Sequence, residues 1–422
     1  MERCAIIGFG CAGYHGAKAL RTYGYTGEIH VFTEDSEAPV NPMLTTYVAG
    51  GKLDAEDGFP FGRLEEIAGE LDLKVHVGKV RKVCSDEMAV ETEDGRSIRF
   101  DKILIATGAD AFVPDMEGRD NENVFVMRTR KDSRMLRDRL EGPKAETAMV
   151  VGASMAGIKV AEILADRGIH CILNDSAPHI FPLAALEPVA QEIEQRISSR
   201  GIQLVFGAGI RRVMERGKGI AVELTDDRVF DCDFLVLCIG TRAATAILDS
   251  KIQVNRGILV DETMETSVKG IYAAGDCAEG KNLQTGQPQL IGLWANAACQ
   301  GRCAGSNMAG MQAEYEGNII HNITHFMDMD FVSLGDRGPA GEQVVFKNPN
   351  KDLMIAAVVK DGACSCINVL GNHENTGIIK SAFMKQMRGS DESLDLFMEE
   401  KLRRQGVDPA FIRILGGART GG

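Results

Sequence analysis

The amino-acid sequence predicts an α/β protein built on parallel sheets. Two segments of the 422-residue chain each run from a short apolar strand through a glycine-rich turn and a helix to a second strand. The first covers residues 5–32 and the second covers residues 149–173. This strand–helix–strand order joins two parallel strands through a crossover helix that packs on their sheet. Because the pattern occurs twice, we expect two sheets of similar design.

Composition and charge exclude several classes of protein. Apolar residues make up 44% of the chain and charged residues 25%, which are ordinary values for a globular protein. The net charge of −13 argues against a partner with a phosphate backbone or an anionic membrane surface. The longest apolar runs, such as residues 234–239, have only the length of a strand, and no targeting segment is seen. We therefore expect a cytoplasmic protein that binds neither nucleic acid nor membrane.

The eleven cysteines are scattered along the chain and form no CxxC pair. This spacing argues against a zinc ribbon or a cysteine-ligated iron–sulfur cluster, so no metal site is expected. Two closer pairs are Cys299 with Cys303 on a predicted helix, and Cys364 with Cys366 on a predicted strand. We expect buried thiols at all four positions, with a C-terminal thiol relay as the alternative.

The first glycine-rich turn, GFGCAG, fits the pattern GxGxxG between a strand at residues 5–8 and a helix at residues 13–23. In this pattern the first glycine permits the turn, the second lets the backbone approach a pyrophosphate, and the third allows close packing of helix on strand. The helix N-terminus offers free N–H groups to the phosphates. Glu34 follows the second strand, residues 28–32, and can accept hydrogen bonds from a ribose diol. The predicted dinucleotide site comprises Gly8, Gly10, Cys11, Ala12, Gly13 and Glu34.

The second turn, GASMAG, is a looser GxSxxG version between a strand at residues 149–151 and a helix at residues 157–167. Its alanine and serine are small enough for the turn to form. Asn174 stands where a ribose-binding acid is usual, and Asp175 follows it. No arginine follows closely to hold a 2′-phosphate, which favours NADH over NADPH. The predicted site comprises Gly152, Ser154, Met155, Ala156, Gly157, Asn174 and Asp175; the alternative is a fold relic that binds no nucleotide.

Further segments make the chain resemble the FAD-dependent pyridine nucleotide–disulfide oxidoreductases. Residues 106–108 resemble the ATG motif of that family, and residues 266–276 resemble its second FAD motif. Residues 235–242 are similar to the strand and turn that return to the FAD domain, and residues 294–302 to the helix after the second FAD motif. The resemblance implies that Asp276 contacts the ribityl chain of FAD. It adds to the cofactor site Asn41, Thr45, Val80, Ala106, Thr107, Gly108, Gly240, Gly275, Asp276 and Trp294.

The resemblance also implies the domain organisation. An FAD-binding domain would be split between residues 1–115 and 246–315, with an NAD(P)-binding domain at 116–245 inserted between them. Residues 316–422 would form a C-terminal α+β interface domain, in which residues 380–404 look helical and charged. Since this domain often forms a dimer in the family, we expect a homodimer or a subunit of a hetero-oligomer.

The loop after the first ribose acid indicates the branch of the family. NADH oxidases, peroxidases and coenzyme A-disulfide reductases carry a redox cysteine there, whereas residues 38–47 contain none. No thiolate relay to a disulfide or peroxide is then available. The sequence resembles the ferredoxin and rubredoxin reductase-like branch, which passes electrons singly to an iron–sulfur or similar protein. Residues 41–47 are also similar to FAD electron-transfer subunits such as that of phenylglyoxylate dehydrogenase.

Two positions depart from the pattern of that branch. A lysine is usual near the flavin N5, but the aligned residue is Thr46, or Thr45 if the loop shifts by one. A glutamate is usual two residues after the last glycine of the NAD motif, but here it is Lys159. We hypothesise that Lys159 takes over the cationic role and stabilises negative charge on reduced flavin. The alternative is an ordinary helix-surface ion pair with Glu162 or Asp166.

The sequence thus predicts an FAD-dependent NAD(P)H oxidoreductase that favours NADH. Hydride would pass between nicotinamide and flavin, and electrons would pass to or from an iron–sulfur protein or other redox subunit. One alternative is an NADH oxidase, a peroxidase or a coenzyme A-disulfide reductase-like enzyme. Another is an FAD-carrying electron-transfer or assembly subunit with a silent NAD site.

Overall fold

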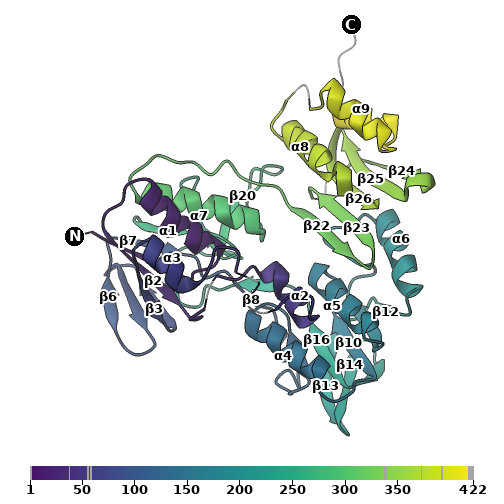
Figure 1. Ribbon diagram of the computed structural model, residues 1–422, viewed down its shortest axis with the longest axis horizontal. Helices are drawn as coiled ribbons and strands as arrows, with labels where there is room; N and C mark the ends of the chain where they lie inside the picture. Colours follow the sequence, from purple (N-terminus) through teal and green to yellow (C-terminus); the bar gives the residue numbers. More distant parts are fainter. Residues whose placement is uncertain are drawn as a thin grey trace. The chain divides into compact units, whose positions relative to one another are not determined.

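The computed structural model describes residues 2–37, 39–54, 57, 59–336, 340–371, 373–390 and 393–416 (Figure 1). The chain divides into two compact units. The first unit comprises residues 1–112, 128–137 and 241–318, and the second comprises residues 113–127, 138–240 and 319–422. Each unit contains one of the two strand–helix–strand segments, so the predicted α/β class is confirmed.

The first unit is centred on a five-stranded parallel sheet. Its order is β19 (Ile271–Ala273), β7 (Lys102–Ile105), β1 (Arg3–Ile7), β2 (Glu28–Thr33) and β3 (Leu73–Val77). After their first residues, Arg3 and Lys102, the central strands β1 and β7 consist of apolar residues with almost no exposed surface, as expected for a parallel sheet covered on both faces. The ends of β1 and β2 deliver the first glycine-rich turn and the residues that follow the second strand to one edge of this sheet.

Two helices of the first unit pack backbone against backbone. Helix α1 (Cys11–Thr22) follows β1, and helix α7 (Trp294–Met308) lies beside it (Figure 1). A Cβ atom on Gly301 would lie 2.2 Å from the carbonyl oxygen of Ala12, and one on Gly305 would lie 2.3 Å from that of Gly16. Only glycine permits this close parallel contact along α7.

Smaller elements complete the first unit. One three-stranded sheet comprises β4 (Val80–Cys84), β5 (Ala89–Thr92) and β6 (Ser97–Arg99), and another comprises β18 (Ile258–Leu259), β20 (Ala278–Lys281) and β21 (Pro288–Leu290). Strand β8 (Ala109–Ala111) pairs with β17 (Thr241–Ala243). The helices are η1 (Pro42–Leu44), α2 (Thr45–Ala49) and α3 (Leu64–Glu70), and α4 (Arg130–Glu141) contributes residues to both units.

The second unit repeats the parallel design. Its sheet has the order β12 (Gln203–Phe206), β11 (His170–Asp175), β10 (Thr147–Val151), β16 (Phe234–Leu237) and β9 (Val124–Val126). Helix α5 (Met155–Asp166) joins β10 to β11, and α6 (Glu187–Ser198) precedes β12. A three-stranded sheet comprises β13 (Ile210–Arg216), β14 (Gly219–Leu224) and β15 (Val229–Cys232).

An antiparallel sheet forms the C-terminal part of the second unit. Its order is β22 (His321–Phe326), β23 (Met329–Leu334), β26 (Ala363–Gly371), β25 (Leu353–Lys360) and β24 (Glu342–Asn348). The helices are η2 (Pro349–Lys351), η3 (His373–Asn375), α8 (Thr376–Met387), α9 (Leu396–Arg404) and α10 (Pro409–Gly416). The sequence suggested one charged helical stretch at residues 380–404, but Gly389 adopts a positive φ of 74° and α8 ends before it.

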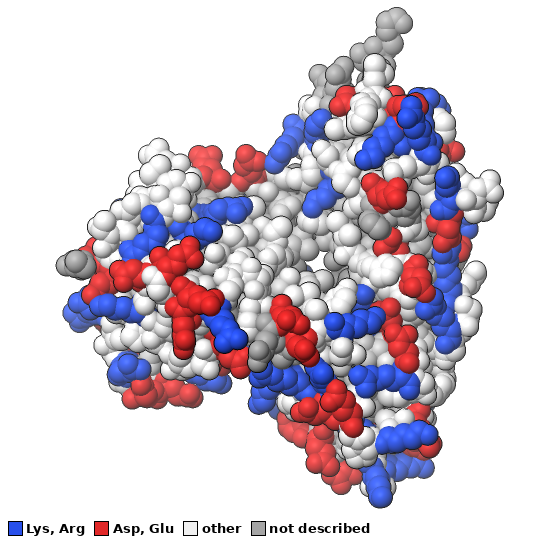
Figure 2. Space-filling view, viewed as in Figure 1, with Lys and Arg blue, Asp and Glu red and all other residues white. Residues whose placement is uncertain are grey.

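Contacts within the second unit join its two sheets. The ring of Phe181 stacks on that of Phe331 with centroids 5.1 Å apart. The Asn368 side chain donates to the Ala184 carbonyl at 3.0 Å, and the Ser333 hydroxyl donates to the same oxygen at 2.8 Å. Acidic and basic side chains also lie side by side on the visible surface (Figure 2), and Arg196 pairs with Asp352 at 2.7 Å.

These contacts explain why the two units differ from the expected three-part division. Residues 319–422 pack with residues 138–240 into one unit, whereas the sequence assigned them to separate domains. The functional division into FAD, NAD(P) and interface domains stays a prediction. Cys303, Cys364 and Cys366 are buried, but Cys299 is exposed on α7, so the expectation of a buried thiol is wrong at that position. In the part of the chain that the structure describes, no helix is both long and apolar enough to cross a membrane.

Candidate functional site

The first glycine-rich turn has the shape of a phosphate cradle. Gly8 has a φ of 89°, and a Cβ atom on it would lie 2.3 Å from the Ala106 carbonyl oxygen. A Cβ atom on Gly13 would lie 2.2 Å from the Gly8 carbonyl oxygen, whereas one on Gly10 would meet no atom within 4 Å. Gly8 and Gly13 are therefore needed for packing, and Gly10 leaves space for a ligand. Because no side chain caps α1 at Gly10, its first amides are free to bind phosphate.

Two cavities meet at this turn and together form what we call the first cleft. One has a volume of about 460 Å³ and the other about 110 Å³, and both are lined by Gly10, Val40, Pro42 and Arg128. The larger cavity includes the predicted residues Gly8, Gly10, Glu34, Val80 and Thr107. The smaller includes the predicted residues Gly10, Cys11, Ala12, Asn41, Ala106, Gly108, Gly275, Asp276 and Trp294. An elongated nucleotide with a planar ring system fits this size and mixture of backbone, apolar and acidic groups.

Sequence reasoning missed a basic pair in the wall of the first cleft. Arg128 donates from Nη2 to Asp276 Oδ2 at 2.7 Å and from Nε to the Ala109 carbonyl at 2.9 Å. Arg130 is buried and pairs with Asp35 Oδ2 at 2.9 Å and with Glu37. In the sequence, residues 128–139 stand out only by their mixture of basic and acidic residues. The three carboxylate partners of the two arginines could not be foreseen, because they lie far from the arginines in the sequence; Asp276, for example, lies 148 residues from Arg128.

The predicted positions near the flavin differ in their access to the cleft. Asn41 lines it, and its Oδ1 accepts a hydrogen bond from the Met43 amide at 3.0 Å. Thr45 and Thr46 are buried in α2, and the Thr45 hydroxyl donates to the Pro42 carbonyl at 2.7 Å. Neither threonine lines the two cavities. Thr46 is therefore a weak candidate for a group that contacts a bound flavin.

The second glycine-rich turn has a backbone conformation like that of the first, but a side chain caps the helix that follows it. Gly152 has a φ of 106°, and a Cβ atom on it would lie 2.4 Å from the Cys238 carbonyl oxygen. The Ser154 side chain caps α5: its hydroxyl accepts from the Gly157 amide at 3.2 Å and donates to the Cys238 carbonyl at 2.8 Å. The serine thus occupies an amide at the helix N-terminus. Met155 and Ala156 begin the helix, and Gly240 follows β16 with a φ of 104°.

The acidic position of the second turn belongs to Asp175 and not to Asn174. Asn174 is 0% exposed, and its Nδ2 donates to the carbonyls of Val205 and Ala208 at 2.7 and 2.9 Å. A side chain committed to neighbouring backbone in this way is not placed to contact a ribose, which corrects the prediction for Asn174. The Asp175 carboxylate accepts from the Ala153 amide at 2.8 Å and remains partly exposed at the end of β11.

Lys159 forms the ion pair that the sequence offered as the alternative. On α5, its Nζ lies 3.6 Å from Glu162 Oε2. The other oxygen of Glu162 accepts a hydrogen bond from the Met327 amide at 2.8 Å. The lysine is thus tied to the contact between the two sheets of the second unit, and its proposed role near a flavin stays a prediction.

Thiol chemistry has little support in the first cleft. Cys11 is the only cysteine among the described residues that line it. Burial raises the pKa of Cys11 to about 12, and its Sγ donates to the Trp294 carbonyl at 3.3 Å. The thiol is therefore protonated at neutral pH and is not a nucleophile. In the described residues, no three histidine, cysteine or acidic side chains are grouped so that they could hold a metal ion.

Comparisons with known proteins agree with this geometry. Residues 2–301 match the family model of the pyridine nucleotide-disulphide oxidoreductases. An NADH oxidase of Methanocaldococcus jannaschii is 28% identical over 345 residues, which are 79% of this chain and 76% of that protein. The epsilon subunit of the NADH-dependent phenylglyoxylate dehydrogenase of Aromatoleum evansii is 27% identical over 354 residues, or 82% of each chain. The structure of a ferredoxin reductase from Rhodopseudomonas palustris has a TM-score of 0.84 at 20% identity, covering 96% of this chain and 100% of its own.

The family match spans both glycine-rich turns, the ATG segment and the segment that ends at Asp276. The cradle at Gly8 to Gly13 and the cleft beside it fit FAD. The frame of the second turn, with Asp175 at its acidic position, fits a pyridine nucleotide. The chain therefore belongs to the pyridine nucleotide-disulphide oxidoreductase family and is an FAD-dependent NAD(P)H oxidoreductase.

Proposed function

We propose that this protein exchanges electrons between NADH and a separate redox protein, without a thiol intermediate. The observation that carries the proposal is the wall of the first cleft, whose only cysteine among the described residues is the protonated Cys11. A disulfide or peroxide relay needs a thiolate beside the flavin. Without one, electrons leave or enter the bound flavin directly.

The side chains divide the binding of two nucleotides. FAD occupies the first cleft, with its pyrophosphate on the open amides beside Gly10 and its ribityl chain at Asp276, which Arg128 holds in place. NADH binds at the second turn, where Asp175 accepts hydrogen bonds from the adenosine ribose. When bound, the two cofactors supply hydride transfer between nicotinamide and flavin, and the flavin can release electrons singly. The protein supplies orientation and electrostatics.

The partner is an iron–sulfur protein or a redox subunit. Support comes from the relatives: one is a subunit of an NADH-dependent dehydrogenase, and another is a ferredoxin reductase. Electrons run toward the partner or toward NAD⁺ according to the partner's potential. We further propose a homodimer or a place in a hetero-oligomer; the relative that is a subunit of a dehydrogenase supports the second arrangement. We also propose a cytoplasmic location, which the eleven free thiols support.

The test is an anaerobic titration of the FAD-loaded protein with NADH and then NADPH, following flavin absorbance at about 450 nm. Prompt bleaching by NADH, with a weaker response to NADPH, is the expected result. Asp175→Ala should raise the NADH concentration needed for half-maximal bleaching by about tenfold, because a charged hydrogen bond to ribose is lost. His325→Ala, an exposed change elsewhere in the second unit, serves as the control.

A second candidate is an FAD-carrying subunit whose NAD site is silent. The observation that favours it is Ser154, which occupies an amide that the first turn leaves open. Absence of bleaching by either nucleotide in FAD-loaded protein would support this candidate and contradict the main proposal. Reduction by NADH that releases new titratable protein thiols would instead support the disulfide-reductase alternative.

A further inference from the structure

An open cavity of about 420 Å³ lies in the C-terminal part of the second unit. Its walls come from the end of β24, the start of β25 and the turn between α9 and α10. It is lined by residues 346–349, 353, 355, 403 and 406–409, and we call it the C-terminal groove. None of these residues belongs to either glycine-rich turn, so the groove shares no residue with the two nucleotide sites.

Contacts between distant segments preform the walls of the C-terminal groove. The Asn348 side chain donates from Nδ2 to the Gly406 carbonyl oxygen at 2.9 Å. Gly406 follows α9 with a φ of 85°, and a Cβ atom on it would lie 2.6 Å from the same Nδ2. The ring centroids of Phe346 on β24 and Phe411 on α10 lie 5.8 Å apart. Strand and helices are therefore fixed to one another, and a ligand does not need to order them.

The floor of the C-terminal groove is apolar. Leu353, Ile355 and Val407 line it and are 5%, 1% and 3% exposed. The half-buried ring of Phe346 adds a flat surface. A hydrocarbon placed on this floor loses its own contact with water, which favours its binding.

Arg403 brings a cation with unused donors to the groove. Its guanidinium lies 3.7 Å from Glu399 Oε2, one turn earlier on α9, and forms no hydrogen bond with any residue that the structure describes. Glu399 does not line the groove, and 49% of the Arg403 side chain is exposed, so this ion pair is weak. Because a guanidinium carries its N–H donors in a planar fork, Arg403 retains donors for a ligand.

The other charged groups of the groove are already occupied. Lys347 pairs with Glu192 at 3.3 Å. Asp408 Oδ1 accepts a hydrogen bond from the Ala410 amide at 2.7 Å, where the start of α10 favours a negative charge. Arg403 is therefore the charged group that a ligand would meet.

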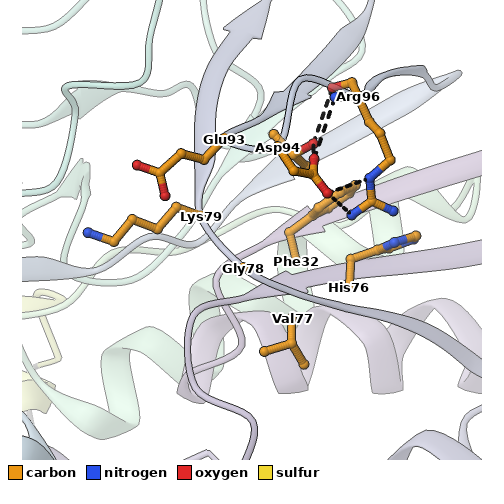
Figure 3. Close-up of a pocket in the computed structure, with 9 residues that line it drawn as sticks. Phe32, His76, Val77, Gly78, Lys79, Glu93, Asp94 and Arg96 are labelled. Carbon is orange, nitrogen blue, oxygen red and sulfur yellow. Dashed lines mark hydrogen bonds and ion pairs between the residues drawn. The ribbon is translucent and has the colours of Figure 1, made fainter.

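Figure 3 shows a cavity of the first unit in which the charges are arranged differently. Its guanidinium belongs to Arg96, whose Nε donates to Asp94 Oδ2 at 2.9 Å, and both residues line that cavity together with Glu93. An acid there would meet two carboxylates and a guanidinium that is already hydrogen-bonded. Arg403 differs from Arg96 because its acidic neighbour stands outside the groove.

We propose that the C-terminal groove binds a small carboxylic acid with an apolar body. The ionised carboxylate accepts hydrogen bonds from the Arg403 guanidinium, whose fork of donors matches two carboxylate oxygens. The apolar body lies on the floor formed by Leu353, Ile355 and Val407. An amine would be repelled by Arg403, and a phosphate would leave the floor uncovered. The volume of about 420 Å³ suits a small molecule.

The test titrates the FAD-loaded, full-length protein with octanoate. Methyl NMR of isoleucine, leucine and valine side chains shows where the acid binds, and isothermal titration calorimetry measures its affinity. Saturable shifts at Ile355 and Val407 are expected, and octanol should bind about tenfold more weakly because it lacks the charge. Absence of saturable binding, binding without shifts at these two residues, or octanol binding as tight as that of octanoate would overturn the inference.

Two neighbouring arginines of α9 provide a matched pair of variants. Arg403→Gln should weaken octanoate binding about tenfold, and Arg403→Lys, which keeps the charge, should restore part of the affinity. Arg404→Gln should leave the affinity unchanged, since Arg404 donates to Glu400 at 2.8 Å and does not line the groove. Both glutamine variants remove one exposed, ion-paired guanidinium, so their thermal unfolding temperatures should agree. Equal octanoate affinities of these two variants would contradict the role of Arg403.

Chain length tests the apolar floor separately from the charge. Octanoate should bind about tenfold more tightly than hexanoate, because two more methylene groups leave water. The same ratio is expected for Arg403→Gln, since that change removes only the partner of the carboxylate. A ratio near one would show that the hydrocarbon does not reach the floor, and would overturn the assignment of an apolar acid.

Discussion

The two glycine-rich turns share one backbone frame. In the first, the Gly8 amide donates to the Phe32 carbonyl at 2.9 Å; in the second, the Gly152 amide donates to the Asn174 carbonyl at 2.7 Å. The last glycine of each motif packs against the carbonyl of the first. The outer glycines therefore specify the fold of the turn, whereas the residues between and after them are the ones that can contact a ligand.

The acidic residues differ between the two turns. Since Phe32 and Asn174 are equivalent, Asp175 corresponds to Thr33, and Glu34 stands one residue later. Asp175 folds back to accept from a turn amide, whereas the Glu34 side chain is 68% exposed and lies beside Lys79. The sequence thus shows an acidic residue near the end of the second strand in both segments. Because the two residues differ by one position relative to the turn, their side chains point in different directions.

The first and the middle glycine of the first motif give the largest expected contrast. Gly8→Ala should lower the free energy of unfolding by about 3 kcal/mol, because the methyl group would overlap the Ala106 carbonyl at a positive φ. Gly10→Ala should leave this free energy unchanged but weaken FAD binding, because the methyl group fills open space. Denaturant unfolding of the flavin-free proteins and FAD titration measure the two effects. Equal destabilisation by both variants would contradict the division between packing and ligand positions.

The two turns also differ at the second residue after the last glycine of each motif. This residue is His15 after the first motif and Lys159 after the second. The sequence hypothesis expects Lys159→Ala to slow flavin reduction by NADH about ten- to a hundredfold. Stopped-flow absorbance measures this rate. Lys347→Ala removes another ion-paired lysine of the second unit and should leave it unchanged. If Lys159→Ala behaves like the control, the lysine is only the partner of Glu162.

Ser154 offers a smaller effect. Ser154→Ala should destabilise the second unit by about 1 kcal/mol through loss of the α5 cap, and Ser154→Gly by only a few tenths. The glycine variant makes the second turn resemble the first, so its NADH affinity should equal or exceed that of the wild type. A large loss of NADH binding in Ser154→Gly would show that the hydroxyl itself contacts the nucleotide.

The smallest effect is expected at Cys11, which corresponds to Met155. Because the pKa of Cys11 is raised to about 12, its thiol stays protonated as the pH rises from about 6 to 9, and the rate of flavin reduction should show no step from its ionisation. Cys11→Ser should keep the wild-type rate across this range. Mass spectrometry after iodoacetamide treatment should find the exposed Cys299 modified and Cys11 intact.

The local sequence pattern correctly predicted the strands and helices that flank the two turns. The expected helix at residues 13–23 is α1 (Cys11–Thr22), and the expected strand at residues 149–151 is β10 (Thr147–Val151). Glycine spacing and apolar runs determine these elements locally. Most of the predicted residues of the FAD site also line one continuous cleft.

Side-chain contacts between segments that are far apart in the sequence could not be predicted from the local sequence pattern. The burial of Asn174 depends on carbonyls of β12 and the turn after it, more than 30 residues away. Arg128 meets Asp276, and His30 meets His76, only because the sheet and its loops bring these segments together. A single sequence shows residue types along the chain, but it does not show which side chains neutralise or orient one another.

The backbone contact between α1 and α7 sets the distance between two parts of the wall of the first cleft. Both helices begin in the wall of the first cleft, α1 at Cys11 and α7 at Trp294. Because Gly301 and Gly305 leave no room for a methyl group between them, the distance between the two helix starts is fixed. A side chain at Gly301 or Gly305 would therefore push the two helix starts apart and change the wall of the first cleft, although neither glycine lines it.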